Sequence, residues 1–153
     1  MQMSPLKNAW IELIQSLDCS HVITLSPFVP GIGGDARFKL GEALARRLKD
    51  RAGLSGGQLV LIPEQSPDGF WHYHGFAASR TVYQQDFLDR QAKDLLEDAM
   101  RKQASLKYGV RYGQEELGCS ALVERRGEDI KPAILYATKQ WDHQDKGSIA
   151  IFV

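Results

Sequence analysis

The sequence predicts an α+β fold: a single central antiparallel sheet of about five strands with helices packed on it. Short β-rich segments recur along the chain, and the turn signal at 66–69 (Ser-Pro-Asp-Gly) joins two of them as a hairpin. The others are separated by stretches whose apolar residues recur at helical spacing. With 153 residues, 43% of them hydrophobic and 25% charged, the composition is that of one globular domain, and we expect a single domain over 1–153.

The first half of the chain predicts two helices and two strands. Residues 4–18 begin with Ser-Pro, typical of a helix start, and continue with apolar residues at helical spacing. Residues 21–25 are β-rich and end at a proline turn, and 58–62 form a second strand. Between them, Asp35 can cap a helix that runs to about residue 51.

The second half predicts the hairpin partner, two further helices and two further strands. Residues 70–77 should pair back onto the preceding strand. Helical spacing extends over 80–106, and 119–124 form a strand. A helix follows from Ile130 with a proline in its first turn, and 148–153 close the chain as a β segment.

Charge and cysteine content limit the classes of function. Nineteen Lys+Arg balance nineteen Asp+Glu, so bulk charge does not favour a nucleic-acid partner. Two cysteines, Cys19 and Cys119, are too few for a disulfide framework or a zinc knuckle, and we expect buried thiols. No stretch approaches the ~18 apolar residues of a membrane span. The first ten residues lack the order of a secretion signal, so we expect an intracellular protein without a membrane partner.

The run from Glu64 to His74 carries the first chemical signal. His72 and His74 alternate in a predicted strand, so both side chains project from one face of the sheet. Glu64 lies just across the hairpin turn, where its carboxylate could complete a mixed nitrogen and oxygen site. Two imidazoles and one carboxylate leave positions open for substrate oxygens, which is typical of a catalytic metal site.

The second chemical signal lies 62 residues after His74, on the helix that starts at Ile130. Tyr136 and Lys139 are spaced i,i+3 and are expected on the same helix face. A tyrosine is a usable nucleophile when a nearby cation lowers the cost of its phenolate, and a lysine can steady a phosphate.

These residues resemble the motifs of the HUH endonucleases, specifically the single-tyrosine replication initiators (Rep) of rolling-circle plasmids and circular single-stranded DNA viruses. Residues 23–27 are similar to the first motif, an apolar strand ending in a Thr-Tyr-Pro-like turn, although Ser26 replaces the aromatic residue. The second motif, His-hydrophobe-His after a metal-binding Glu, and the third, Tyr-x-x-Lys, are matched in order by Glu64, His72, His74, Tyr136 and Lys139. The resemblance spans roughly 21–142, with a longer interval before the tyrosine than is expected of the viral proteins.

The resemblance implies a metal-dependent endonuclease and strand transferase that nicks and rejoins single-stranded DNA, specific for a sequence or an origin hairpin. Tyr136 would attack the scissile phosphate, giving a 5′-phosphotyrosine and a free 3′-hydroxyl, and Lys139 would offset the phosphate charge. Mg²⁺ or Mn²⁺ would be held by Glu64, His72 and His74. The implied setting is the start of rolling-circle replication of a plasmid, phage or virus, in a prokaryotic cytoplasm or a eukaryotic nucleus. Because no phosphate loop is present, we expect no helicase domain in this chain and a separate helicase as partner.

Other interpretations stay open. A single-tyrosine HUH transposase of a small insertion sequence would use the same chemistry, and an origin-binding module would recognise DNA without cutting it. An iron oxygenase could also use two histidines and a carboxylate, but would leave Tyr136 and Lys139 without a role.

The remaining polar and aromatic residues carry weaker expectations. The cations at the end of the second helix could follow a DNA backbone, although they also suit the helix dipole. Trp71 and Tyr73 should face away from the histidines, into the core. His21 and His143 are expected at the surface or at strand ends. The candidate DNA-contacting residues are Arg46, Arg47, Lys49 and Arg51.

Overall fold

The computed structural model describes residues 5–27, 36–65, 71–108, 120–126, 130–139 and 151–152. The helices are α1 (Pro5–Ser16), α2 (Ala36–Ala52), α3 (Val82–Arg90), α4 (Ala92–Tyr108) and α5 (Lys131–Ala137). The strands are β1 (His21–Ser26), β2 (Leu59–Gln65), β3 (Trp71–Ala77), β4 (Ser120–Arg125) and β5 (Ile151–Phe152).

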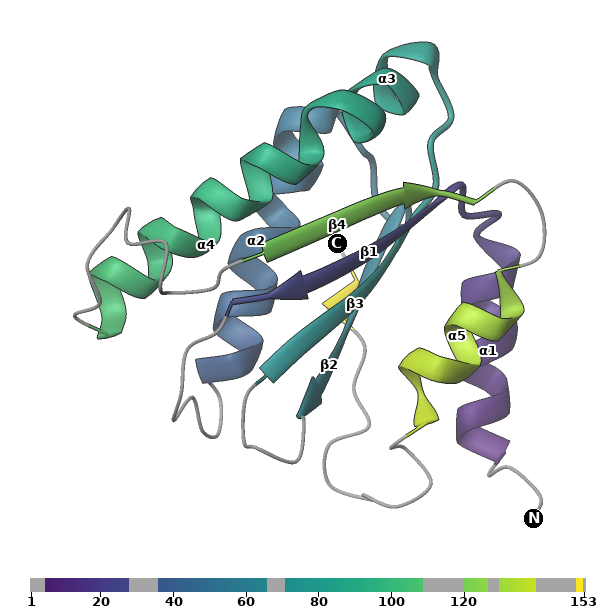
Figure 1. The fold of residues 1–153 in the computed structure, drawn as a ribbon. Helices are drawn as coiled ribbons and strands as arrows, with labels where there is room; N and C mark the ends of the chain where they lie inside the picture. Colours follow the sequence, from purple (N-terminus) through teal and green to yellow (C-terminus); the bar gives the residue numbers. More distant parts are fainter. Residues whose placement is uncertain are drawn as a thin grey trace.

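The strands form one open antiparallel sheet in the order β4-β1-β3-β2-β5 (Figure 1). In chain order, β1, α2, β2, β3, the pair α3 and α4, and β4 follow the split β-α-β arrangement, in which β3 lies between β1 and β2. An α+β fold with one antiparallel sheet is therefore confirmed. The count of about five strands stays a prediction, because β5 contributes two residues at the edge of β2.

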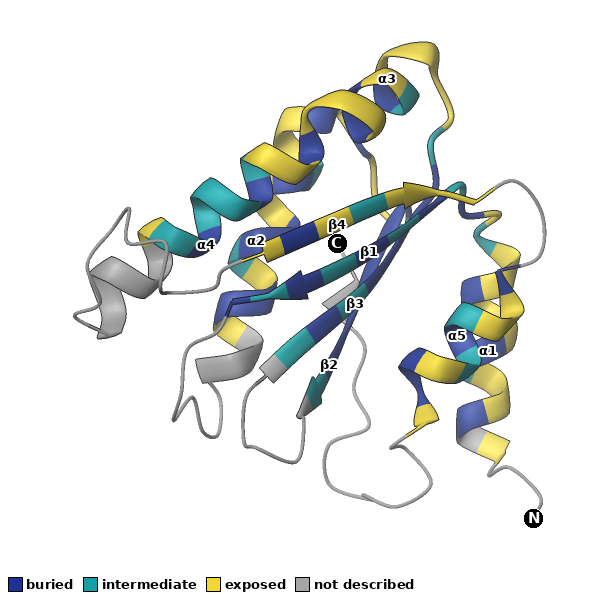
Figure 2. Ribbon diagram, viewed as in Figure 1, coloured by how far each residue is buried: buried dark blue, intermediate teal, exposed yellow. Residues whose placement is uncertain are grey.

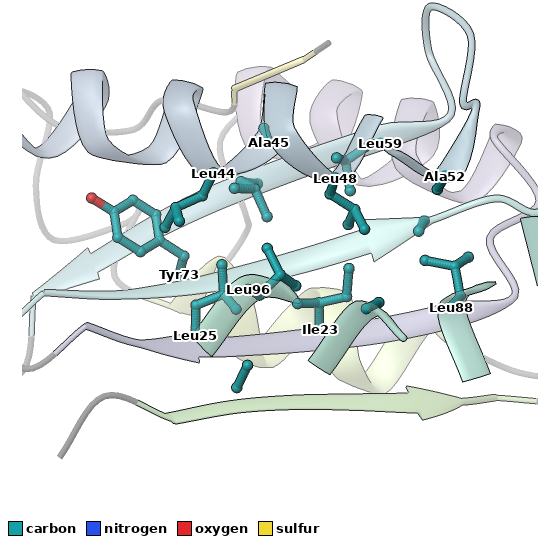
Figure 3. Packing of buried hydrophobic residues seen from close by; sticks show 14 of the residues in the cluster. Ile23, Leu25, Leu44, Ala45, Leu48, Ala52, Leu59, Tyr73, Leu88 and Leu96 are labelled. Atoms are coloured by element: carbon teal, nitrogen blue, oxygen red, sulfur yellow. The ribbon is translucent and has the colours of Figure 1, made fainter. Parts of the chain in front are cut away.

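Helices cover both faces of the sheet (Figures 1 and 2). On one face, α2, α3 and α4 bury a core against β1, β2 and β3, in which Ile23, Leu59 and Tyr73 are fully enclosed (Figure 3). On the other face, α1 and α5 bury a second core with Val60, Ile62 and Phe76. The sheet is thus the middle layer of three, and alternate residues of each strand belong to opposite cores.

β3 is a central strand and leaves little space at its midpoint. Its residues pair with β1 on one side and β2 on the other, so Gly75 lies opposite both Ile23 and Leu61. A Cβ atom at Gly75 would lie 2.6 Å from Leu61 Cδ2 and 3.0 Å from Ile23 Cβ. Glycine here allows the close approach of neighbouring side chains over the strand that carries both histidines.

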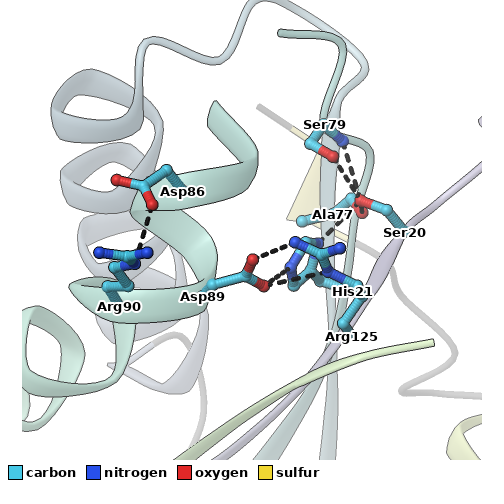
Figure 4. Close-up of polar contacts among 8 residues, drawn as sticks. All are labelled: Ser20, His21, Ala77, Ser79, Asp86, Asp89, Arg90 and Arg125. Carbon is cyan, nitrogen blue, oxygen red and sulfur yellow. Dashed lines mark hydrogen bonds and ion pairs between the residues drawn. The ribbon is translucent and has the colours of Figure 1, made fainter. Parts of the chain in front are cut away.

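Two expectations about local structure are confirmed in part. The region expected to be helical over 80–106 is helical but divides into two helices, because α3 ends at its C-cap Gln91, whose amide donates to the carbonyl of Phe87, and α4 starts at the next residue. His21, expected at the surface or at a strand end, is the first residue of β1 but is fully buried. Its burial is tolerated because both ring nitrogens have partners, Ser20 Oγ at Nδ1 and Asp89 Oδ1 at Nε2, each at 2.8 Å (Figure 4).

Several other expectations have a clear outcome. Cys19 is buried, and Tyr73 lies in the core on the face away from the histidines. Cys119 and His143, and the side chain of Trp71, lie outside the described residues. Within the described ranges, no helix combines the length and apolar character needed to cross a membrane.

Candidate functional site

The candidate site lies on the sheet face that α1 and α5 cover. Glu64 of β2 is directly opposite His72 of β3, and His74 is directly opposite Thr24 of β1. Opposite residues of antiparallel strands point to the same side, as do residues two apart in one strand. The register therefore places Glu64, His72, His74 and Thr24 on one face.

Glu64 is the centre of the polar contacts at this site. Its Oε2 atom lies 2.7 Å from His74 Nε2, and its Oε1 atom lies 3.0 Å from Lys139 Nζ. The side chains of Glu64 and His74 are only 11% and 13% exposed. The nearly buried Glu64 carboxylate thus contacts both His74 on the central strand β3 and Lys139, which follows α5.

Tyr136 lies on α5 and reaches the same group of residues. Its ring stands edge-on to the His74 ring, with centroids 5.6 Å apart and an interplanar angle of 87°. Lys139 Nζ lies over the Tyr136 ring, 3.5 Å from its centroid. Tyr136 is nevertheless 59% exposed, so much of its side chain faces solvent at the site.

Lys139 does not share a helix face with Tyr136 as the spacing predicts. α5 ends at Ala137, where the amide of Thr138 donates to the carbonyl of Ile134 and its hydroxyl donates to the same carbonyl at 2.9 Å. Lys139 follows this C-cap, outside α5. Because its side chain is long and flexible, it still reaches both the Tyr136 ring and Glu64.

His72 has a different partner from His74. Its Nδ1 atom lies 3.0 Å from Ser26 Oγ, at the end of β1. Ser26, where the resemblance leads one to expect an aromatic residue, is therefore part of the site. Sequence reasoning missed this contact, although the alternation along β1 already places Ser26 on the same face as Thr24.

The predicted metal ligands fit a cation in part. Glu64 Oε2 and His74 Nε2 lie 2.7 Å apart and are hydrogen-bonded to each other, and carboxylate and imidazole are ligand types that suit several divalent metals. Across the described ranges, no group of three or more His, Cys, Asp or Glu side chains could hold a metal ion. The structure thus brings two of the three predicted ligands into contact, while the third contacts Ser26.

Burial and neighbouring charges together determine the protonation states of His74 and Lys139. Burial lowers the pKa of His74, because the imidazolium loses solvation, and the nearby Glu64 carboxylate opposes this effect. Burial would also lower the pKa of Lys139, but its interactions with Glu64 and Tyr136 outweigh this and raise that pKa above its usual value. A neutral His74 therefore donates its Nε2 proton to Glu64, and Lys139 carries a positive charge.

These side chains line one end of a cavity of about 840 Å³ on the sheet face. Its middle is apolar, formed by residues such as Val22, Phe76 and Pro132. At the far end, Arg126 Nη2 lies 3.5 Å from Glu124 Oε2. Neither of these two charged residues was singled out by the sequence reasoning, and the alternation of β4 next to β1 is the signal that places Glu124 on this face.

The predicted DNA-contacting cations lie apart from this cavity. α2, which carries them, packs on the opposite face of the sheet from α1 and α5 (Figure 1). Arg46, Arg47 and Arg51 are exposed and Lys49 is half-buried, and none of them lines the cavity around Glu64. A single strand in the cavity would have to pass around the sheet to reach them, so the structure does not bring them together with the site.

A second polar cluster has a structural role. Ser20, His21 and Asp89 form a chain of hydrogen bonds that resembles a catalytic relay (Figure 4). However, the Ser20 hydroxyl also contacts Ser79 Oγ at 2.8 Å and accepts from the Ser79 amide at 3.1 Å. Asp89 also pairs with Arg125 of β4, so the cluster links strands β1, β3 and β4 to helix α3.

Comparisons with known proteins give no relative for this chain. No protein-family model matches it, no curated protein matches it, and no solved structure matches it. Its function is therefore inferred from the geometry of the site itself.

Proposed function

We propose that this chain nicks and rejoins single-stranded DNA through a covalent bond to Tyr136, in the manner of the single-tyrosine HUH endonucleases. One observation carries the proposal: Tyr136 lies 5.6 Å from His74, ring to ring, and Lys139 connects it to Glu64. These residues come from segments 62 positions apart in the chain, and they line the same cavity. The cavity therefore combines a nucleophile, Tyr136, with the positive charge of Lys139 and with carboxylate and imidazole groups. This combination suits phosphoryl transfer.

Tyr136 is the attacking group in this proposal. Its hydroxyl loses a proton to solvent, and its oxygen forms a bond to the scissile phosphorus while the bond from phosphorus to the 3′-oxygen breaks. The 3′-oxygen leaves and takes up a proton, giving a 3′-hydroxyl and a 5′-phosphotyrosine. The reverse reaction rejoins the strand without an external energy source, because one phosphodiester replaces another.

Glu64 and His74, with His72 as the third donor, would hold Mg²⁺ or Mn²⁺. Such a cation would polarise the phosphate and offset the charge that develops on it. Support for this part is the contact between Glu64 and His74 and the shared face with His72. Arg126 at the far end of the cavity supplies a positive charge where the adjoining DNA backbone could lie.

Initiation of rolling-circle replication is the setting that the resemblance implies, with a separate helicase to supply single strands. The rolling-circle setting is proposed from the order of the three motifs in the sequence. Nicking and rejoining of DNA by Tyr136 could equally serve another setting.

The test is formation of a covalent adduct. The full chain is incubated with Mn²⁺ and a pool of single-stranded oligonucleotides with randomised centres and a 3′ label, and label that migrates with the protein in SDS is measured. We expect an adduct with the wild type and none with Tyr136→Phe. Tyr83→Phe is the matched control, because Tyr83 is 61% exposed but lies on α3, on the other side of the sheet.

Two results would contradict the proposal. An adduct that persists in Tyr136→Phe would show that another group is the nucleophile. Absence of any adduct with the wild type, across the whole pool and with bound Mn²⁺, would favour a module that binds DNA without cutting it.

A further inference from the structure

Helix α2 carries a concentration of positive charge that the rest of the chain balances. Its 17 residues include six Lys and Arg against two Glu and Asp, although the whole chain has equal numbers of both signs. The cations of α2 whose side chains the structure describes are all exposed or half-buried: Lys39, Arg46, Arg47, Lys49 and Arg51. The neutrality of the chain therefore hides a strongly cationic helix on the sheet face opposite the candidate site.

These five cations differ from those of the adjacent helix α4 in having no acidic partner. On α4, Lys93 pairs with Glu97 and Lys102 pairs with Asp98, both at i,i+4 spacing. On α2, none of the five cationic groups forms an ion pair with any residue that the structure describes. Their charges are therefore available to an anion from outside the chain.

The helix dipole explains only part of this pattern. A cation is favoured in the last turn of a helix, and Lys49 and Arg51 lie there. Lys39 lies in the first turn, where the dipole disfavours a positive charge, and Arg46 lies before the last turn, where the effect has faded. The positive charge of α2 thus exceeds what stabilises the helix itself.

We propose that the exposed face of α2 binds the phosphate backbone of double-stranded DNA. The choice of DNA follows the proposed function, whereas recognition of a duplex backbone does not depend on Tyr136. Lys39 and Arg51 are 12 positions apart, which corresponds to about 18 Å along the helix axis. A duplex carries about one negative charge per 1.7 Å, so it presents roughly ten phosphates over this length.

The side chains of α2 suit a duplex better than a single strand. Proteins that bind single strands combine cations with aromatic rings on which the bases stack. Among the described residues of α2, no large apolar or aromatic side chain is exposed. The exposed ring of Tyr83 lies only at the end of the helix, where its hydroxyl donates to the carbonyl of Arg51 at 3.2 Å. A duplex stacks its bases internally and offers phosphates, which need only cations.

A lipid surface is the other extended anion that a cationic helix can meet. Helices that lie in a membrane interface bury an apolar side among the lipids. The apolar side of α2 is already buried in the protein core through Leu40, Leu44 and Leu48. Glu42 and Asp50 are also exposed on α2 and repel phosphate, so we expect modest duplex affinity that falls steeply with salt.

The test is fluorescence anisotropy of a labelled DNA duplex of random sequence, titrated with the full chain at about 50 to 200 mM NaCl. The test variant combines Arg46→Gln, Arg47→Gln and Arg51→Gln, because all three side chains are exposed. Each lost phosphate contact lowers the salt dependence of log Kd by about one. We therefore expect this slope to fall by about two to three, and Kd at low salt to rise about tenfold or more.

The matched control combines Lys93→Gln, Arg101→Gln and Lys102→Gln on α4. It removes the same net charge from cations that already have acidic partners. We expect its Kd to stay within about twofold of the wild type, because charges beyond a Debye length are largely screened. Circular dichroism spectra and melting curves confirm that each variant is folded. An equal loss of binding in both variants would overturn the proposal, because net charge alone would then explain it.

Other results would also overturn it. These are duplex binding that the α2 variant retains in full, no duplex binding by the wild type, and α2-dependent binding that is tighter for a single strand, an RNA duplex or phosphatidylserine vesicles. Tyr136→Phe should bind the duplex as the wild type does. If the wild type forms no covalent adduct but keeps α2-dependent duplex binding, the proposed function fails alone. If it forms the adduct without such binding, only the α2 proposal fails.

Discussion

Substitution of Gly75 by alanine should destabilise the protein through β3, the strand that carries both histidines. The added Cβ would lie 2.6 Å from Leu61 Cδ2 and 3.0 Å from Ile23 Cβ. Carbon atoms in contact prefer about 3.5–4.0 Å, so the closer neighbour would have to move by about 1 Å. Leu61 and Ile23 are 1% and 0% exposed, so both side chains belong to the filled core.

The expected cost is about 1–3 kcal/mol of the free energy of unfolding, the usual range for an extra carbon in a filled core. For a chain of this length that corresponds to a fall in Tm of roughly 2–4 °C per kcal/mol. The assay is urea unfolding followed by circular dichroism, with the slope compared between variants to confirm that the extent of unfolding is unchanged.

Gly56→Ala is the matched control, because no atom lies within 4 Å of its added Cβ and its φ is not positive. We expect it to be neutral or slightly stabilising. In a double-mutant cycle, Gly75→Ala should cost less stability in a Leu61→Ala background than in the wild type, since the smaller neighbour makes room for the new carbon. Equal stability of Gly75→Ala and Gly56→Ala would refute the packing argument.

Three further predictions concern single ionisable groups. Burial raises the pKa of Cys19 to about 12, so in a Cys119→Ser background its thiol should resist a disulfide reagent at pH 8 and react on unfolding; fast reaction of the native protein would contradict this. The hydrogen bond from Arg125 lowers the pKa of Asp89, so its contribution to stability is present above the unfolded pKa of about 4 and is lost as pH falls through the folded pKa; the stability deficit of Asp89→Asn should be larger at pH 7 than at pH 3 in urea titrations. In metal-free protein, the His74 ring should titrate by NMR below 6.5, and Glu64→Gln should lower its pKa further because the carboxylate is what opposes the effect of burial; an upward shift would contradict the assigned contact.

The sequence predicted the parts of the site that depend on local periodicity. Alternation along β3 places His72 and His74 on one face, and the turn signal brings Glu64 opposite His72. These features depend on the pleat of a strand and on a short connection between two paired strands, both of which are encoded within a few residues. The α+β class follows from the same local signals.

What the sequence could not predict depends on tertiary contacts. The helix end at Thr138, which takes Lys139 out of α5, is set by a side-chain hydrogen bond that competes with the helix. Burial of His21 requires Asp89, which is 68 positions away in the chain. Helix α2 lies on the face opposite the site because of the way the chain connects the strands. The cations near the end of α2 do not indicate which face of the sheet the helix covers.

The position of Tyr136 depends on residues that do not line the cavity. α5 is a helix of seven residues, too short to be stable alone, and it is held by Ile134, which is buried in the core that α1 contributes to through Ile11 and Ile14. Helix α1, the first element of the chain, therefore fixes the distance from the tyrosine to His74. Shortening Ile134 would leave Glu64, His72 and His74 in place on the strands and still displace Tyr136 on α5, so the geometry of the site is set by the packing of α1 on α5 as much as by the polar residues themselves.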